Sequence, residues 1–151
     1  MATLEERIAR LEAIEDIRQL KARYCAYGDR LLPLDDVHTM FTPDAVWDGG
    51  RAGRHEGRDA IAAYFRLQVP NMLFSAHLLA NPVIAVDGGT ARAQWWSITP
   101  ATRLREGKQQ AYWMLGAYDD RLVQRDGRWL FQAVNFRISF VAPHQSGWAE
   151  V

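Results

Sequence analysis

The stretch TARAQWWSITPATRLREGKQQAYWMLGAYDDRLVQRDGRWLFQAVNFRISFV, residues 90–141, decides the fold of this protein. It contains three strand-like runs, over Thr90–Leu104, Gln110–Gln124 and Trp129–Val141. Glu106-Gly107-Lys108 and Arg125-Asp126-Gly127-Arg128 separate these runs, and short segments with glycine are typical of tight turns between antiparallel strands. The stretch therefore predicts three consecutive antiparallel strands.

Two further strands are predicted before this stretch. Ser75–Val86 ends in Asp87-Gly88-Gly89, which is a strong hairpin signal. A short strand at Ala45–Asp48 follows a turn at Thr42-Pro43-Asp44 and is closed by Gly49-Gly50. The predicted sheet therefore has four long strands in the second half of the chain and one short strand in the first half.

Helices are predicted in the first half of the chain. Apolar residues recur at steps of three and four at Leu4, Ile8, Leu11, Ile14, Ile17 and Leu20. This pattern predicts an amphipathic helix from about residue 3 to about residue 28, with its stripe facing a core. Thr3 and Glu6 have capping-box spacing at its start, and Gly28 is a stop signal at its end. Shorter helices are predicted over residues 34–41 and 57–67.

The order of these elements indicates an α+β fold. Four long antiparallel strands joined by tight turns form a sheet that is too long and too twisted to stay flat. We expect this sheet to curl into a cone-shaped α+β barrel around the first helix, with a pocket inside the cone. A chain of 151 residues is in the range of one domain, so residues 1–151 are predicted to form a single domain.

The composition limits the classes of partner. With 18 basic and 18 acidic residues, the formal net charge of zero argues against nucleic-acid binding and against a polybasic membrane patch. The charged N-terminal sequence lacks the apolar core of a signal peptide. Cys25 is the only cysteine, so an intramolecular disulfide or a CxxC motif cannot form. We expect a cytoplasmic protein without a metal site, a membrane span or a nucleic-acid partner.

Four segments resemble the SnoaL-like branch of the nuclear transport factor 2-like superfamily. They are IEDIRQLKARYCAYGDR (residues 14–30), FTPDAVWDGG (41–50), HLLANPVIAVDGGTARA (77–93) and YDDRLVQRDGRWLF (118–131). Within the superfamily the sequence is most similar to scytalone dehydratase, the bacterial bile-acid 7α-dehydratase and hexachlorocyclohexane dehydrochlorinase. The resemblance implies a cone-shaped fold, catalysis without a cofactor, a histidine–aspartate dyad in the pocket and a homotrimer, with a dimer as the alternative.

The resemblance places the dyad at His77 and Asp29. An imidazole titrates near neutral pH, so it can accept a proton and return it. A carboxylate bound to one ring nitrogen fixes the tautomer and stabilises the imidazolium that forms. Spacing alone favours a buried structural histidine and a solvated carboxylate at the end of a helix. The resemblance at both positions favours the dyad.

The resemblance also implies further pocket residues. Tyr24 lies five residues before Asp29, as in the bile-acid dehydratases, and would stabilise a developing oxyanion. A core aromatic is the alternative for Tyr24, and Tyr27 could take its place. Arg137 matches an arginine that could bind a substrate oxygen or carboxylate, with a surface ion pair as the alternative. Trp47, Trp113 and Tyr118 complete the predicted substrate-binding residues.

The resemblance implies a lyase that performs a dehydratase-type elimination. His77 would be the general base, and the substrate would be small to medium in size, largely apolar and ring-containing, aromatic or steroid-like. One alternative is an isomerase or hydrolase of the same fold, similar to ketosteroid isomerase, in which Asp48 would matter more. Another alternative is a non-catalytic binding or assembly subunit, similar to the β subunits of ring-hydroxylating dioxygenases. The aromatic residues of the sheet are expected to form two groups, one lining the pocket and one covering a subunit interface.

Overall fold

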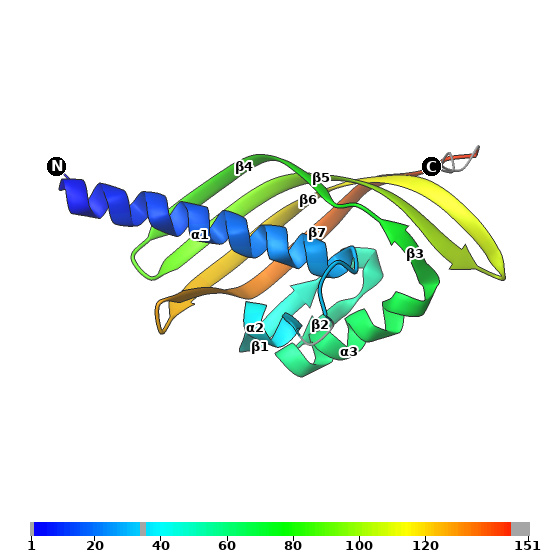
Figure 1. The fold of residues 1–151 in the computed structure, drawn as a ribbon, viewed down its shortest axis with the longest axis horizontal. Coiled ribbons are helices and arrows are strands. Elements are labelled where there is room, and N and C mark those ends of the chain that lie inside the picture. The colour runs from blue at the N-terminus through cyan, green and yellow to red at the C-terminus, as the bar shows by residue number, and fades with distance from the viewer. Residues whose placement is uncertain (1, 34–35, 146–151) are drawn as a thin grey trace.

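The computed structural model describes residues 2–33 and 36–145. A long helix lies along one face of a curved sheet, and shorter elements pack near the end of that helix (Figure 1). In chain order the elements are α1 (Leu4–Gly28), α2 (Val37–Met40), β1 (Phe41–Asp48), η2 (Gly50–Ala52), β2 (Arg54–Glu56), α3 (Arg58–Gln68), η3 (Val69–Asn71), β3 (Met72–Ser75), β4 (Leu78–Asp87), β5 (Thr90–Arg105), β6 (Lys108–Arg125) and β7 (Arg128–Pro143). Among the described residues, no helix is both long enough and apolar enough to span a membrane.

The seven strands form one curved, open sheet. Its order is β2-β1-β7-β6-β5-β3, and β4 also pairs with β5. The long antiparallel ladders β4–β5, β5–β6 and β6–β7 confirm the predicted hairpins. The expectation of an entirely antiparallel sheet is wrong, because β1 runs parallel to β7, with Trp47 opposite Val134. Turn sequences reveal hairpin partners only, whereas β1 and β7 are separated by most of the chain.

The strand predicted over Ser75–Val86 is two strands. β3 pairs with one end of β5, opposite residues 101–103, and β4 pairs with the rest of β5, opposite residues 90–98. Ala76 and His77 lie between the two strands. The Ala76 amide still donates to a backbone carbonyl of β5, whereas the His77 amide is released to a side chain. Neither a glycine nor a proline lies at the break, so the sequence does not reveal it.

Two earlier elements also differ from the prediction. β1 begins at Phe41 and includes Thr42-Pro43-Asp44, which the sequence predicts as a turn. A register shift between Phe41 and Val46 accommodates these residues within the strand. The helix predicted over residues 34–41 is the shorter α2, and residues 34 and 35 lie outside the described part of the chain. β2 has only three residues and was not predicted.

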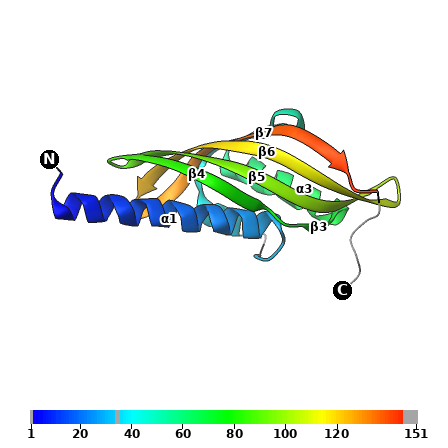
Figure 2. The same ribbon diagram turned by 90° about the horizontal axis from the view of Figure 1, so that it is seen from above.

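α1 crosses the concave face of the sheet (Figure 2). Its capping box is present, since Thr3 and Glu6 exchange side-chain to backbone hydrogen bonds. Ile17 and Leu20 are buried, whereas Leu4, Ile8 and Leu11 are 68%, 46% and 65% exposed. The expectation that the whole stripe faces the core is therefore wrong for the first turns of α1, because the helix extends beyond the edge of the sheet (Figure 1).

The sheet separates its side chains into an inner and an outer group. Along β5, buried and exposed residues alternate with the period of two that a strand requires. Ala91, Ala93 and Trp95 face the core, whereas Trp96 and Ile98 point outward and are 46% and 39% exposed. The inner face therefore provides the wall behind α1, and the outer face carries an exposed apolar patch.

Candidate functional site

The end of α1 directs Asp29 away from the helix. Asp29 is the C-cap, and the following residue, Arg30, has a left-handed φ of 63°. The Leu31 amide donates to the Ala26 carbonyl at 2.8 Å, and the Arg30 amide donates to the carbonyl three residues before it. These bonds form a Schellman motif, which closes the helix. Asp29 therefore lies beyond the last helical residue, so it reaches the same region as Tyr24 despite the five-residue spacing.

His77 meets Asp29 through both its ring and its backbone. His77 Nδ1 lies 2.6 Å from Asp29 Oδ1, and the His77 amide donates to Asp29 Oδ2 at 2.8 Å. The Ser75 hydroxyl also donates to Asp29 Oδ1 at 2.8 Å. The break between β3 and β4 makes this arrangement possible, because it frees the His77 amide from the strand ladder. Two residues 48 positions apart are thereby held in one geometry.

The carboxylate fixes which nitrogen of the imidazole carries hydrogen. An ionised carboxylate only accepts hydrogen bonds, so Nδ1 of a neutral His77 must be the donor. Nε2 then carries the lone pair that can accept a proton. The His77 and Asp29 side chains are 18% and 11% exposed. His77 lines an internal cavity, and Asp29 stands behind it. The pair can therefore act as a general base toward a molecule in that cavity.

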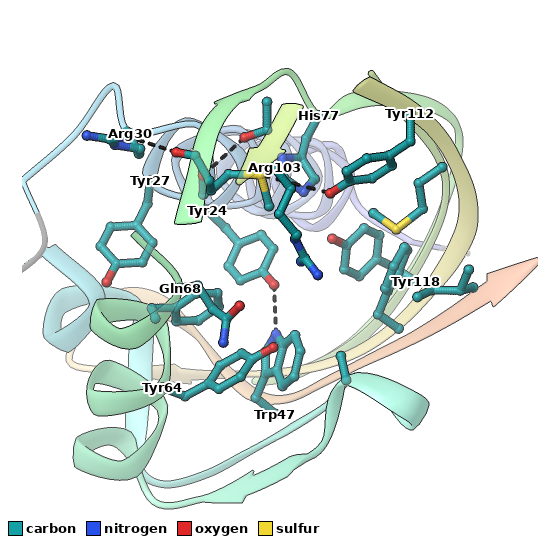
Figure 3. Close-up of a pocket in the computed structure, with 18 residues that line it drawn as sticks. Tyr24, Tyr27, Arg30, Trp47, Tyr64, Gln68, His77, Arg103, Tyr112 and Tyr118 are labelled. Carbon is teal, nitrogen blue, oxygen red and sulfur yellow. Dashed lines mark hydrogen bonds between the residues drawn. The ribbon is translucent and has the colours of Figure 1, made fainter. Parts of the chain in front are cut away.

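An apolar cavity of about 170 Å³ lies between α1, α3 and the inner face of the sheet (Figure 3). Its lining is mainly aromatic and includes Tyr24, Tyr27, Trp47, Tyr64, Phe65, Tyr112, Tyr118 and Phe136. An engineered apolar cavity of about 150 Å³ holds one benzene molecule. The cavity therefore suits one ring with substituents, and a four-ring steroid would extend out of it.

Tyr24 is buried among aromatic side chains and is held by a hydrogen bond. Its hydroxyl oxygen accepts from Trp47 Nε1 at 2.8 Å. The Tyr118 ring lies edge-on to the Tyr24 ring, with the ring centroids 6.0 Å apart. Burial raises the pKa of Tyr24 and that of Tyr118 well above their ordinary values, while the bond from Trp47 opposes this effect at Tyr24. Both phenols therefore stay protonated, and the hydrogen of the Tyr24 hydroxyl is left to donate to a ligand.

Two glycines allow aromatic walls to approach closely. A Cβ at Gly49 would lie 2.4 Å from the Trp47 ring. A Cβ at Gly116 would lie 2.4 Å from the Phe136 ring and 2.8 Å from the Arg137 carbonyl oxygen. Real Cβ atoms essentially never approach other atoms this closely. Because glycine has no side chain at these two positions, the rings of Trp47 and Phe136 can pack directly against the backbone.

A buried ion pair supports the wall of the cavity from behind. Lys21 Nζ lies 2.7 Å from Asp120 Oδ2, and both side chains are 0% exposed. The Lys21 ammonium also lies 3.4 Å from the centroid of the Tyr118 ring, which lines the cavity. Burial lowers the pKa of Lys21 and raises the pKa of Asp120, whereas their mutual attraction opposes both shifts. The sequence analysis did not single out this pair.

Most of the predicted site residues line the cavity, but Asp29 stands behind His77, and Trp113 and Arg137 lie outside the cavity. Tyr24, Tyr27, Trp47, Tyr118 and His77 contribute to its lining. Trp113 is on the opposite face of β6, where it packs against His144 at 6.4 Å. Strand alternation explains this correction, since Tyr112 and Met114 take the inward positions on either side of it.

Arg137 is the second correction. It is exposed on β7 and binds Asp48 Oδ1 at 3.0 Å, which is the surface ion pair weighed as the alternative. Its Nη1 also donates to the backbone carbonyls of Asp48 and Phe136. The matching arginine was placed by a similarity that does not fix the strand register, and a shift of one residue moves a side chain to the other face.

The structure adds residues that the sequence analysis missed. Ser75 bonds Asp29, and Tyr64, Tyr112 and Arg103 line the cavity. Arg103 has the same parity along β5 as the inward-facing alanines, so strand alternation could have indicated it. Ser75 lies two residues before His77, but only the contact with the helix end gives it a role. No sequence signal links Tyr64 on α3 to the sheet.

Comparisons with known proteins place this geometry in context. The profile of the SnoaL-like domain family matches residues 9–135. An uncharacterized protein of Mycobacterium tuberculosis is 30% identical over 115 residues, which cover 76% of this chain and 77% of that protein. A solved hexachlorocyclohexane dehydrochlorinase, LinA, is 16% identical and has a TM-score of 0.84 over 96% of this chain and 97% of its own. A scytalone dehydratase-like protein of Novosphingobium aromaticivorans is 20% identical and has a TM-score of 0.78 over 93% and 97% of the two chains.

The two solved structures share the fold of this protein, namely a long N-terminal helix and a curved, open, mixed sheet. The family profile covers most of the chain, including both Asp29 and His77. The chain therefore belongs to the SnoaL-like family and has its nuclear transport factor 2-like fold.

Proposed function

We propose that this protein is a lyase that works without a cofactor and performs an elimination on an apolar, ring-containing carbonyl compound. The observation that carries the proposal is the contact of 2.6 Å between His77 and Asp29 at the wall of a mainly aromatic cavity. A base held in this way in an apolar cavity suits removal of a proton from carbon. The leaving group in the proposed reaction is hydroxide or a comparable anion.

The proposed reaction begins at His77. Nε2 takes a proton from the carbon next to the carbonyl, and the electrons of that C–H bond form the new C=C bond. The bond from the neighbouring carbon to the leaving group breaks at the same time or in a second step. Asp29 stabilises the imidazolium. His77 then returns its proton to the departing hydroxide, which leaves as water, and the neutral imidazole is restored.

Tyr24 is proposed to stabilise the carbonyl oxygen while the proton is removed. Its hydroxyl oxygen already accepts from Trp47, so its own hydrogen is free to donate. A donor aimed at the oxygen where negative charge develops lowers the barrier most in a site that excludes water. Tyr24 is 5% exposed, and aromatic rings surround it. Its position supports the role of an oxyanion donor.

The alternative that depends on Asp48 has less support. Asp48 does not line the cavity, and it accepts hydrogen bonds from the Gly50 amide and from Arg137. These two bonds lower the pKa of Asp48 below its ordinary value, which makes it a weaker base. An isomerase or hydrolase built on Asp48 would also need it to face the ligand. The geometry therefore favours His77 as the base.

The proposal can be tested with 3-hydroxy-1-tetralone, a fused-ring β-hydroxyketone that gives fluorescent 1-naphthol when it loses water. We expect the His77→Ala variant to lose about 10²- to 10⁴-fold in turnover, the usual contribution of a general base. Asp29→Asn should also lose turnover, because its amide can no longer stabilise the imidazolium. His38→Ala is the matched control, since His38 is bonded to Asp59 outside the cavity.

The melting temperature should be measured for each variant, so that loss of fold is separated from loss of chemistry. A folded His77→Ala variant with undiminished turnover would show that His77 is not the base. Exchange of the α-protons in heavy water should be followed as well, because it reports proton removal without any elimination. A wild-type protein that binds the ketone but catalyses neither reaction would support the non-catalytic alternative.

A further inference from the structure

Arg103 enters the cavity from the end of β5. Figure 3 shows its guanidinium directed into the space between Tyr24 and Tyr118. Arg103 lines both the enclosed cavity and a wider basin into which the cavity opens, which we call the mouth basin. Arg51, Arg105 and Gln109 are among the other residues of the mouth basin. A ligand that passes from the mouth basin into the cavity therefore passes Arg103.

The charge of Arg103 is not matched by a carboxylate. Arg23, Arg54, Arg92 and Arg137 each lie in an ion pair with a carboxylate elsewhere on the molecule. None of the described residues lining the cavity or the mouth basin is an aspartate or a glutamate. The other guanidinium of the cavity, that of Arg30, donates to the Met72 carbonyl. The cavity is therefore lined by two guanidinium groups that lack a carboxylate partner within the described part of the chain, and that of Arg30 is held by a backbone carbonyl.

Tyrosines on two walls of the cavity interact with the guanidinium of Arg103. Its Cζ lies 6.0 Å from the centroid of the Tyr112 ring on β6. Its charge lowers the pKa of Tyr112 and also that of Tyr64 on α3, although burial raises both more strongly. Arg103, Tyr112 and Tyr64 all line the same cavity. The guanidinium of Arg103 is therefore accessible from the cavity as well as from the surrounding solvent.

We propose that Arg103 binds a carboxylate of the substrate, so that the natural ligand is a ring compound with an acidic group directed toward the mouth basin. The proposal rests on the proposed function, because it names the substrate class of the same site. The planar guanidinium matches a carboxylate with two parallel hydrogen bonds. The guanidinium of Arg103, beside the Tyr112 ring, suits one negative charge.

The residues that line the cavity indicate the size and the chemistry of the rest of the ligand. Tyr24, Trp47, Phe65 and Phe136 enclose a space of about 170 Å³, which suits one ring. His77 lines the same enclosed space, so a ring anchored by Arg103 lies against the base. The carboxylate is distinct from the carbonyl that activates the proton. It sets the orientation of the ring, and His77 and Tyr24 act on the other end.

Binding of trans-cinnamate and of its neutral isostere trans-cinnamamide tests the proposal by calorimetry. We expect wild-type protein to bind cinnamate at least about tenfold more tightly than the amide, in line with a charge-assisted hydrogen bond. Arg103→Gln should reduce this ratio to about one and leave cinnamamide affinity unchanged. Arg125→Gln is the matched control, because it removes the same charge from the neighbouring strand β6 but lines neither the cavity nor the mouth basin.

Three results would overturn the proposal. The first is equal affinity of wild-type protein for the two compounds, including no binding of either. The second is an unchanged ratio in a folded Arg103→Gln variant. The third is tighter binding of phenyl phosphate than of cinnamate, lost in Arg103→Gln, which would make the site a phosphate site.

The same measurement in the His77→Ala variant separates this proposal from the proposed function. If the His77→Ala variant still prefers cinnamate over cinnamamide, Arg103 binds the carboxylate whether or not the protein catalyses elimination. Turnover of 3-hydroxy-1-tetralone without any cinnamate preference would support the lyase and refute the carboxylate site.

Discussion

At the scale of single residues, Lys21 and Asp120 connect stability with the shape of the site. Both charges are buried completely, so each depends on the other for compensation. The Tyr118 ring covers the Lys21 ammonium on the cavity side. A substitution of Lys21 or Asp120 should therefore affect Tyr118 in the cavity wall as well as the stability of the core.

Lys21→Met should destabilise the fold by about 3–5 kcal/mol, because it leaves Asp120 buried without a partner. The double variant Lys21→Met, Asp120→Leu should recover most of this loss. Burial already raises the pKa of Asp120, and loss of Lys21 raises it further, so the deficit should shrink as the pH falls and Asp120 becomes neutral. Urea unfolding of both variants measures the effect. An equal loss in the exposed control Lys108→Met would contradict the explanation.

Cys25 provides a prediction for alkaline pH. Burial raises the pKa of its thiol from 9.0 to about 12, with the Lys21 charge opposing the shift. A raised pKa in the folded state gives stability that is complete below 9.0 and is lost as the pH rises toward 12. The stability difference between wild type and Cys25→Ala should therefore fall across this range. A native thiol that reacts with Ellman's reagent as fast as the unfolded chain would contradict the buried position.

At the scale of elements, local signals predicted most of the fold. The β5–β6 and β6–β7 hairpins follow from strand periods and from turns at Gly107 and Gly127, whose φ values of 74° and 73° favour glycine. The parallel pairing of β1 with β7 and the break before β4 leave no such local signal. They depend on which segments meet after the chain folds.

The candidate site shows the same division. His77 and Asp29 were proposed from a resemblance, since their spacing alone favours structural roles. Tyr118 and Trp113 were both proposed, but only Tyr118 lines the cavity, because a single step along β6 reverses the face. The same argument from strand alternation could have predicted that Arg103 faces the cavity. Contacts between distant elements, such as Ser75 with Asp29, require the folded structure.

Gly116→Ala should disturb the site through one element, β6. The new Cβ would collide with the Phe136 ring and with a backbone carbonyl that cannot rotate away. We expect a loss of about 1–3 kcal/mol in unfolding free energy, typical of overpacking, and weaker binding of cinnamamide as Phe136 shifts. Gly89→Ala is the control, since a Cβ there meets nothing within 4 Å and its φ is not positive. Equal stability of the two variants would refute this role of Gly116.

At the scale of the whole molecule, the outer face of the sheet carries an exposed apolar row. Leu78, Ile98, Leu115 and Phe140 lie side by side across β4, β5, β6 and β7. Trp96 lies on the same face and is 46% exposed. Exposed patches of this kind mark sites of association. They give the expected homo-oligomer a surface on which copies of the chain can meet.

We expect a homotrimer, with a dimer as the alternative, and light scattering after size exclusion distinguishes the two. Trp96→Lys should shift the protein toward the mass of one chain, because a charge in an apolar contact must be desolvated. Gln94→Lys adds the same charge on the same face of β5, two residues away, and should leave the mass unchanged. A wild-type protein with the mass of a single chain would refute the oligomer.

The dyad is anchored where regular structure stops, at the end of α1 and between β3 and β4, whereas the wall residues Tyr112, Met114 and Ile138 lie within β6 and β7. Tyr112, Met114 and Ile138 can therefore be exchanged without touching any bond that holds Asp29 or His77. For protein engineering, this makes the sheet the variable part of the scaffold and the irregular joints the constant part. A library restricted to those three wall positions would change which molecules fit while leaving the contact between His77 and Asp29 in place.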